Sequence, residues 1–194
     1  MRRASYRRSK CERASFELME KFWVFGYGSL MWQPGFDYEE RRPAMLNGLH
    51  RSLCVYSHVH RGTPERPGLV MGLDRGGSCR GVAFRIREDS WNSVMDYLRA
   101  REQVTMVYKE TRRMIRLDGE RDMVSAVTYV VDRSHRQYAG KLTREDQLAH
   151  VLQAEGRSGR NPEYVLNTAD HLIELGLDDP DLQWLARQLR PSGG

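Results

Sequence analysis

The order of the secondary-structure patterns constrains the fold of this chain more than any other feature. Short apolar and β-branched segments, typical of strands, fill most of the first two thirds of the sequence. One segment among them, 89–101, instead carries apolar residues at helical spacing, headed by Trp91. From Thr143 onward the helical spacing dominates. Strands first, one helix among them and helices last predict a mixed α+β fold.

The individual elements follow from the same patterns. We predict strands over 22–27, 44–57, 69–73, 81–86, 104–117 and 123–131. The turn formers Asp74-Arg75-Gly76-Gly77 predict that 69–73 and 81–86 are two arms of a hairpin. Helical faces are predicted from three sets of residues: Leu148, Val151 and Leu152; Val165, Ala169, Leu172 and Ile173; and the segment 182–189.

The length of 194 residues suits one domain with a substantial core. The net charge is +5, and much of the excess lies in the polar, aperiodic start of the chain. We therefore predict a disordered basic tail over 1–15 and a single domain over 16–194. A basic tail can touch nucleic acid or a membrane surface, but the chain lacks a nucleic-acid-binding motif, so no nucleic-acid partner is predicted.

Cysteine usage and hydropathy bear on the compartment. The three cysteines are far apart and form no Cys-x-x-Cys pair, which predicts neither a disulfide framework nor a zinc site. His58 and His60 would share one face of a strand, but no third ligand is placed near them. No apolar run reaches the length of a membrane span. We expect a cytoplasmic protein with no bound metal and no membrane partner.

A glycine turn is the first candidate site. Gly26-Tyr27-Gly28-Ser29-Leu30 follows a predicted strand directly, so its backbone amides can point at a ligand where the strand ends. Glycine permits the positive φ angles and the close approach that such a site needs. The turn fits neither a dinucleotide fingerprint nor a phosphate loop, since Met31 occupies the third glycine position and no Gly-Lys-Ser/Thr follows. The alternative is a tight turn that only closes a strand.

Glu102 is the second candidate. It lies eleven residues after Trp91, about three helical turns, and continues the apolar stripe of Met95 and Leu98. The spacing predicts an inward carboxylate at the C-terminal end of a helix, where burial and the helix dipole both disfavour its charged form. A carboxylate with a raised pKa is a candidate general base. The alternative is that Glu102 turns into solvent or pairs with Arg99 or Arg101.

Several strings of the sequence resemble the ChaC-type γ-glutamylcyclotransferases. The most specific is Phe25-Gly26-Tyr27-Gly28-Ser29-Leu30-Met31-Trp32. Others follow in the order of that family: Arg61-Gly62-Thr63-Pro64 to Gly68-Leu69-Val70, Gly81-Val82-Ala83-Phe84-Arg85, Tyr97-Leu98-Arg99-Ala100-Arg101-Glu102 and Asn161-Pro162-Glu163-Tyr164-Val165. Together they cover most of the chain from Phe22 to about Gly176.

The resemblance implies a fold, an activity and a site. The implied fold is a small closed β-barrel surrounded by helices. The implied reaction cleaves glutathione or a related γ-glutamyl peptide to 5-oxoproline and, for glutathione, Cys-Gly, without a cofactor. It places the catalytic glutamate at Glu102, the substrate-binding turn at Tyr27, Gly28, Ser29 and Leu30, and a further pocket residue at Tyr164.

One departure from the family keeps other substrates open. Glutathione-acting members often place small residues and an aromatic after the glutamate, whereas Gln103-Val104-Thr105 follows here. A cyclotransferase for other γ-glutamyl amino acids or amines is therefore the alternative within the same chemistry. A non-enzymatic binding or regulatory module is the alternative of another class, and retention of Glu102 argues against it. The sequence makes no prediction of oligomeric state.

Overall fold

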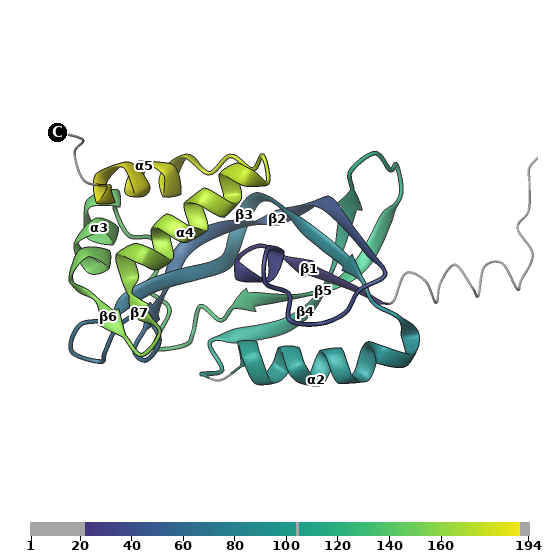
Figure 1. The fold of residues 1–194 in the computed structure, drawn as a ribbon, viewed down its shortest axis with the longest axis horizontal. Helices are drawn as coiled ribbons and strands as arrows, with labels where there is room; N and C mark the ends of the chain where they lie inside the picture. Colours follow the sequence, from purple (N-terminus) through teal and green to yellow (C-terminus); the bar gives the residue numbers. More distant parts are fainter. Residues whose placement is uncertain (1–21, 104, 191–194) are drawn as a thin grey trace, which may run out of the picture.

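The computed structural model describes residues 22–103 and 105–190, and Figure 1 shows their arrangement. The predicted basic tail, 1–15, lies outside this part of the chain. The strands are β1 (Trp23–Gly26), β2 (Glu40–Ser57), β3 (Gly68–Arg85), β4 (Tyr108–Leu117), β5 (Met123–Val131), β6 (Glu155–Gly156) and β7 (Gly159–Arg160). The helices are α2 (Trp91–Glu102), α3 (Arg144–Gln153), α4 (Asn161–Glu174) and α5 (Pro180–Leu189), with short 3-10 turns η1 (Ser29–Met31) and η2 (Glu88–Ser90).

Five strands close into a mixed barrel in the order β1-β3-β2-β4-β5. Closure comes from a short parallel pairing of β1 with β5, in which Trp23 lies opposite Ala126, whereas the other neighbours pair antiparallel. Aromatic and aliphatic side chains such as Phe25, Phe84 and Ile115 are fully buried in the core. The expected α+β fold, a small mixed barrel with surrounding helices, is confirmed.

The predicted hairpin across Asp74–Gly77 is wrong. Residues 68–85 form one long strand, β3, that pairs with β2 along almost its whole length. Gly76 and Gly77 adopt positive φ angles of 99° and 64°, but they lie opposite a register shift after Asn47 and form a bulge. The local turn signal was real, and the 18 residues of β2 supplied a partner that kept the strand continuous.

The helices surround the barrel on opposite sides. In Figure 1, α2 lies along one side of the barrel, and α4 and α5 lie across the other, over β2 and β3. Two residues predicted for buried helical faces are instead exposed, Leu152 by 55% and Ile173 by 53%. Consecutive helical residues point about 100° apart, so the neighbours Val151 and Leu172 take the buried positions. No helix within the described ranges is long and apolar enough to cross a membrane.

Candidate functional site

The glycine turn lies where β1 leaves the barrel. A Cβ on Gly26 would stand 3.0 Å from Cβ of Leu30, so glycine lets the chain fold back on itself. A Cβ on Gly28 would meet nothing within 4 Å. Gly28 has a φ of −131°, so the predicted positive φ is absent here, and glycine serves to leave space above the turn. The first N–H groups of η1, beginning at Ser29, have no acceptor within it.

Glu102 is the last residue of α2, and its side chain is 18% exposed. Its helical neighbours Met95 and Leu98 are buried in the core, so the helix turns this face toward the barrel. Burial raises the pKa of the Glu102 carboxyl, and the nearby charge of Arg101 acts to lower it. Nε of Arg101 lies 3.3 Å from Oε1 of Glu102. The carboxylate is therefore turned inward and paired with Arg101 at the same time.

The predicted site residues meet around one small cavity of about 40 Å³. Its lining comprises Tyr27, Gly28, Ser29, Leu30, Met71, Glu102, Tyr129 and Tyr164. All six predicted residues are among them, although they come from the turn after β1, from η1, from α2 and from α4. The side chain of Glu102 and the glycine turn therefore line the same cavity.

Tyr164 is placed by a pair of hydrogen bonds one helical turn before it. Asn161, at the start of α4, accepts a hydrogen bond from Leu69 N–H at 2.7 Å and donates one to Leu69 C=O at 2.8 Å. These bonds join α4 to a stretch of β3 that pairs with no described strand on this edge. Tyr164 then follows on the same helical face, and its hydroxyl accepts from Met71 N–H at 3.1 Å.

Two tyrosines of the site were missed by the sequence reasoning. Tyr129 on β5 lines the cavity and is 1% exposed, and its hydroxyl has no hydrogen-bond partner among the residues described. Tyr108 lies beside the cavity and donates to Met71 C=O at 2.7 Å. Burial, then the nearby carboxylates of Glu110 and Glu102, raise the pKa of Tyr129. A phenol inside a largely apolar strand was the available signal for Tyr129, but both faces of this part of β5 are buried, so the alternation of side chains gave no direction.

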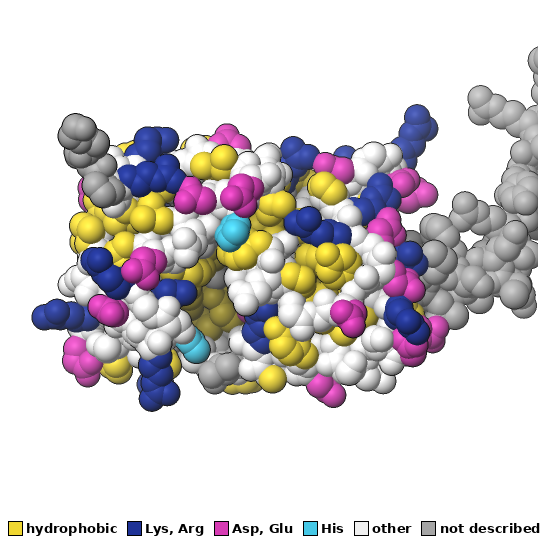
Figure 2. All heavy atoms as spheres, in the orientation of Figure 1, with side chains coloured by type: hydrophobic (Ala, Val, Ile, Leu, Met, Phe, Trp, Pro, Cys, Tyr) yellow, Lys and Arg dark blue, Asp and Glu magenta, His cyan; other side chains and the backbone are white. Residues whose placement is uncertain are grey.

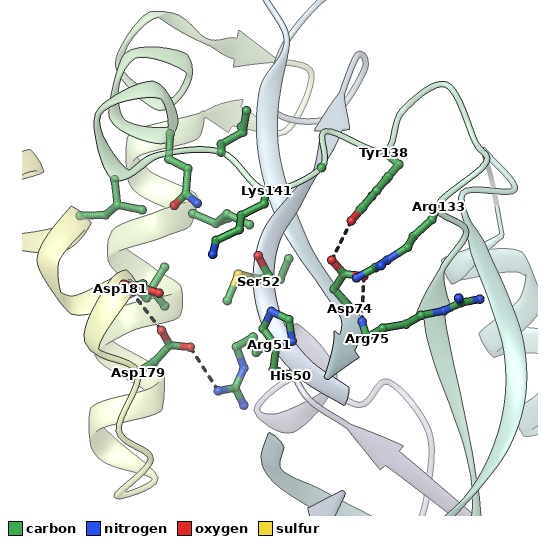
Figure 3. A pocket seen from close by; sticks show the side chains of 17 residues that line it. His50, Arg51, Ser52, Asp74, Arg75, Arg133, Tyr138, Lys141, Asp179 and Asp181 are labelled. Carbon is green, nitrogen blue, oxygen red and sulfur yellow. Dashed lines mark hydrogen bonds and ion pairs between the residues drawn. The ribbon is translucent and has the colours of Figure 1, made fainter. Parts of the chain in front are cut away.

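A second cavity, of about 450 Å³, lies between the barrel and the C-terminal helices (Figure 3). Its buried charges are already paired. Asp74 accepts from Arg133 Nε at 2.6 Å, Tyr138 hydroxyl at 2.8 Å and Arg75 N–H at 2.8 Å. Burial acts to raise the pKa of Asp74, but these hydrogen bonds outweigh it and hold the pKa below its usual range. Arg51 is likewise paired, with Asp179.

Other candidate groups do not form a site. His60 bonds Ser158, and within the described ranges no group of three His, Cys, Asp or Glu side chains could hold a metal ion. Cys54 and Cys79 are free and buried, and burial raises the pKa of the Cys54 thiol to about 12, far from a reactive thiolate. On the face shown in Figure 2, basic and acidic side chains are interspersed.

Comparison with known proteins identifies relatives of this chain. The model of the ChaC-like protein family matches residues 22–190. The chain is 35% identical over 160 residues to the glutathione-specific gamma-glutamylcyclotransferase of Escherichia coli, covering 82% of this chain and 69% of that protein. It is 34% identical over 161 residues to glutathione-specific gamma-glutamylcyclotransferase 1 of Mus musculus, covering 81% and 72%. A crystal structure of a glutathione-specific γ-glutamyl cyclotransferase from yeast has the same fold, with a TM-score of 0.78, 22% identity and coverage of 87% and 95%.

Proposed function

The chain belongs to the ChaC-like protein family, and we propose that it cleaves glutathione to 5-oxoproline and Cys-Gly. The observation that carries this proposal is the inward Glu102 carboxylate, which faces the glycine turn across a small cavity. The named activity of the Escherichia coli and mouse relatives supports the substrate. The small-molecule partner is then the γ-glutamyl tripeptide itself.

The reaction is intramolecular. The α-amine of the γ-glutamyl group attacks its own δ-carbonyl, a C–N bond forms in a five-membered ring, and the bond to the cysteinyl nitrogen breaks. Holding the folded conformer supplies a large part of the catalysis. The α-amine has a pKa near 8 and is mostly protonated at neutral pH. Two protons leave this nitrogen before it becomes the lactam N–H. One is released to solvent, from which the freed amine of Cys-Gly later takes up a proton. The other is taken by the Glu102 carboxylate as the ring forms and is then delivered to the departing cysteinyl nitrogen.

The turn stabilises the charge that develops on the δ-oxygen. N–H groups of Gly28, Ser29 and Leu30 are the proposed donors, and a donor of this kind is typically worth about 3 kcal/mol. The hydroxyl of Tyr129, which has no hydrogen-bond partner within the described ranges, is a further proposed donor, since a buried phenol of this kind gains most from a substrate acceptor. Tyr27 and Tyr164 are proposed to line the substrate. All steps use proton transfer and hydrogen bonding by the chain's own residues.

The first test incubates purified protein with glutathione and follows 5-oxoproline and Cys-Gly by mass spectrometry. Glu102→Gln is the control, because it keeps the size of the side chain and removes the base. Both products from wild type and neither from the variant would support the proposal. Turnover of other γ-glutamyl dipeptides or γ-glutamyl amines without turnover of glutathione would replace glutathione as the proposed substrate. No turnover of any of these compounds would favour a binding module.

The proposed compartment is the cytoplasm. Glutathione and thioredoxin keep thiols reduced there, and Cys54 and Cys79 are both free thiols in the structure. Fractionation of cells that express the full chain with a C-terminal tag would test this placement, and recovery outside the cytoplasmic fraction would contradict it.

A further inference from the structure

Arginine side chains hold the outer side of the glycine turn. Arg51 Nε donates to Tyr27 C=O at 2.6 Å, and Arg41 Nη2 donates to Met31 C=O at 3.1 Å. Arg101 Nη1 donates to the carbonyls of Gln33 at 2.8 Å and Pro34 at 3.2 Å. These guanidinium groups come from β2 and α2, far apart in sequence, and each ends on the same short segment, 27–34.

We propose that Arg51 and Arg101, together the arginine clamp, are positioning residues of the cyclotransferase reaction. The clamp holds the turn so that its amides face the cavity, and Arg101 also fixes Glu102 against the turn. This inference rests on the proposed function for its role in catalysis. Its structural part, a turn held by two arginines, can be tested without any turnover.

The direction of the Gly28 amide follows from the Arg51 bond. In a planar trans peptide the C=O and the next N–H point in opposite directions. Because Arg51 binds the carbonyl of Tyr27, it fixes the N–H of Gly28 on the side away from Arg51. A Cβ built on Gly28 meets only open space, and Gly28 lines the cavity. Arg51 therefore sets the orientation of one proposed oxyanion donor without touching the substrate.

Arg51 is itself held firmly. Its side chain is only 6% exposed, and it also donates to Arg80 C=O at 2.7 Å and pairs with Asp179 at 3.4 Å (Figure 3). Asp179 in turn accepts from Leu182 N–H at 3.1 Å and caps α5. A buried guanidinium needs several acceptors, and the planar fork supplies donors in fixed directions that a lysine ammonium lacks.

Arg101 joins the acid to the turn. Its Nη2 donates to Ser29 Oγ at 3.0 Å, while its Nε lies 3.3 Å from Glu102 Oε1. Consecutive residues of a helix do not face each other along its length, so this contact depends on their place at the end of α2. Since Ser29 Oγ accepts from Arg101, the hydroxyl hydrogen of Ser29 stays available to donate elsewhere. One guanidinium thus sets the spacing between the proposed base and the proposed oxyanion donors.

The catalytic test compares Arg51→Gln and Arg101→Gln with matched controls. The first control is Arg42→Gln, because Arg42 lies on the same strand as Arg51 but bonds Asp118 and Glu120. The second is Arg99→Gln, because Arg99 lies on α2 but pairs with Glu110 and Asp96. We expect each clamp variant to lower kcat on glutathione about 100-fold, the size typical of a lost oxyanion donor or a misplaced group. KM should change only a few-fold. The controls should retain kcat within about threefold of wild type, as expected for exposed ion pairs.

The pH profile separates the two clamp residues. Arg101 lowers the pKa of Glu102, so Arg101→Gln should move the acidic limb of the kcat profile to higher pH. Arg51→Gln should leave that limb where it is, because Arg51 orients the turn and does not contact Glu102. Arg101→Lys should return the acidic limb part of the way to its wild-type pH, since lysine restores the positive charge but not the planar guanidinium group. An unmoved limb in Arg101→Gln would overturn the link to Glu102.

Backbone amide hydrogen exchange tests the clamp apart from the activity. The amides of 28–33 should exchange faster in both clamp variants than in wild type, Arg42→Gln or Arg99→Gln, with amides of β5 unchanged. Unchanged exchange together with unchanged kcat would overturn the clamp, whereas silence of wild type on glutathione would overturn the proposed function alone. If Arg51→Gln fails to fold, Arg51→Lys carries the same measurement, with melting temperature as the check.

Discussion

Two cavities of this protein, the candidate site and the cavity beside the C-terminal helices, differ in size and in how their polar groups are satisfied. The larger one, about 450 Å³, contains buried charges that are paired: Asp74 has three donors, and Arg51 has Asp179 and two carbonyls. The smaller one, about 40 Å³, is lined by Glu102, whose pKa is raised, and by Tyr129, whose hydroxyl has no hydrogen-bond partner in the part of the chain that the structure describes. The pKa of Asp74 is held low by its donors, whereas burial outweighs the single charge of Arg101 and raises the pKa of Glu102. A buried group whose charged form is disfavoured has something to offer a ligand. In this molecule the state of the buried polar groups, more than the volume of the cavity, distinguishes the candidate site.

The largest expected effect is the loss of activity in Glu102→Gln. Removing a general acid–base group typically costs 100- to 10,000-fold, and we expect a loss in kcat of at least about 1,000-fold because the same group serves both proton transfers. Stability should not fall. Burial raises the pKa of Glu102, so its ionised form opposes folding at neutral pH, and the neutral amide removes that penalty. Steady-state kinetics and thermal melting measure the two effects, and near wild-type kcat would exclude Glu102 as the base.

The pH dependence of the wild-type protein separates the role of Glu102 in activity from the role of Asp74 in stability. Activity requires the Glu102 carboxylate, so kcat should fall about tenfold per pH unit below the pKa of this group in the complex. Because burial raises this pKa, the fall should begin at higher pH than for an exposed glutamate. Asp74 has the opposite shift: its contribution to stability is present above its unfolded pKa and is lost as the pH falls through its lower folded pKa. An acidic limb of activity that coincides with acid unfolding would contradict this separation.

Gly28→Ala tests whether the open space above the turn is used by substrate. The added methyl group meets no atom within 4 Å, so no steric clash with neighbouring residues opposes the substitution, and thermal melting checks that the fold persists. We expect kcat/KM to drop about 100-fold, because the methyl group would stand between the turn and the substrate. Gly26→Ala, whose methyl group presses on Leu30 at 3.0 Å, should lower the melting temperature as well. Full activity in Gly28→Ala would exclude close approach of substrate at this point.

A matched pair of tyrosines gives the smallest expected effects and the most direct comparison. Tyr129→Phe removes the unpartnered hydroxyl of the small cavity, and should lower kcat about tenfold with stability unchanged or raised. Tyr138→Phe removes a donor to Asp74 in the large cavity, and should lower stability by about 1 kcal/mol with kcat unchanged. Denaturant unfolding and steady-state kinetics on both variants check whether kcat falls only in Tyr129→Phe and stability falls only in Tyr138→Phe. The reverse pattern would mean that the large cavity is the one in use.

Local patterns in the sequence were sufficient to identify most of the helices and strands. Apolar and β-branched runs gave most of the barrel strands, and the spacing from Trp91 to Glu102 gave both α2 and the inward direction of the acid. The glycine turn and the Asn161–Tyr164 segment could be singled out because their motifs are contiguous. These features depend on residues within a few turns or strand steps of one another, which is the range over which periodicity and turn chemistry act.

Long-range pairing decided the rest. Whether Gly76 and Gly77 end a strand or bend one depended on the length of β2 beside them, and closure of the barrel depended on β1 meeting β5. The role of Tyr129 could not be read from its own strand, because both faces of β5 are buried there. The arginine clamp likewise exists only in three dimensions, since surface and clamp arginines are alike in sequence. The sequence by itself determined which groups were available for chemistry, and the tertiary structure decided which of them were buried and which neighbours they met.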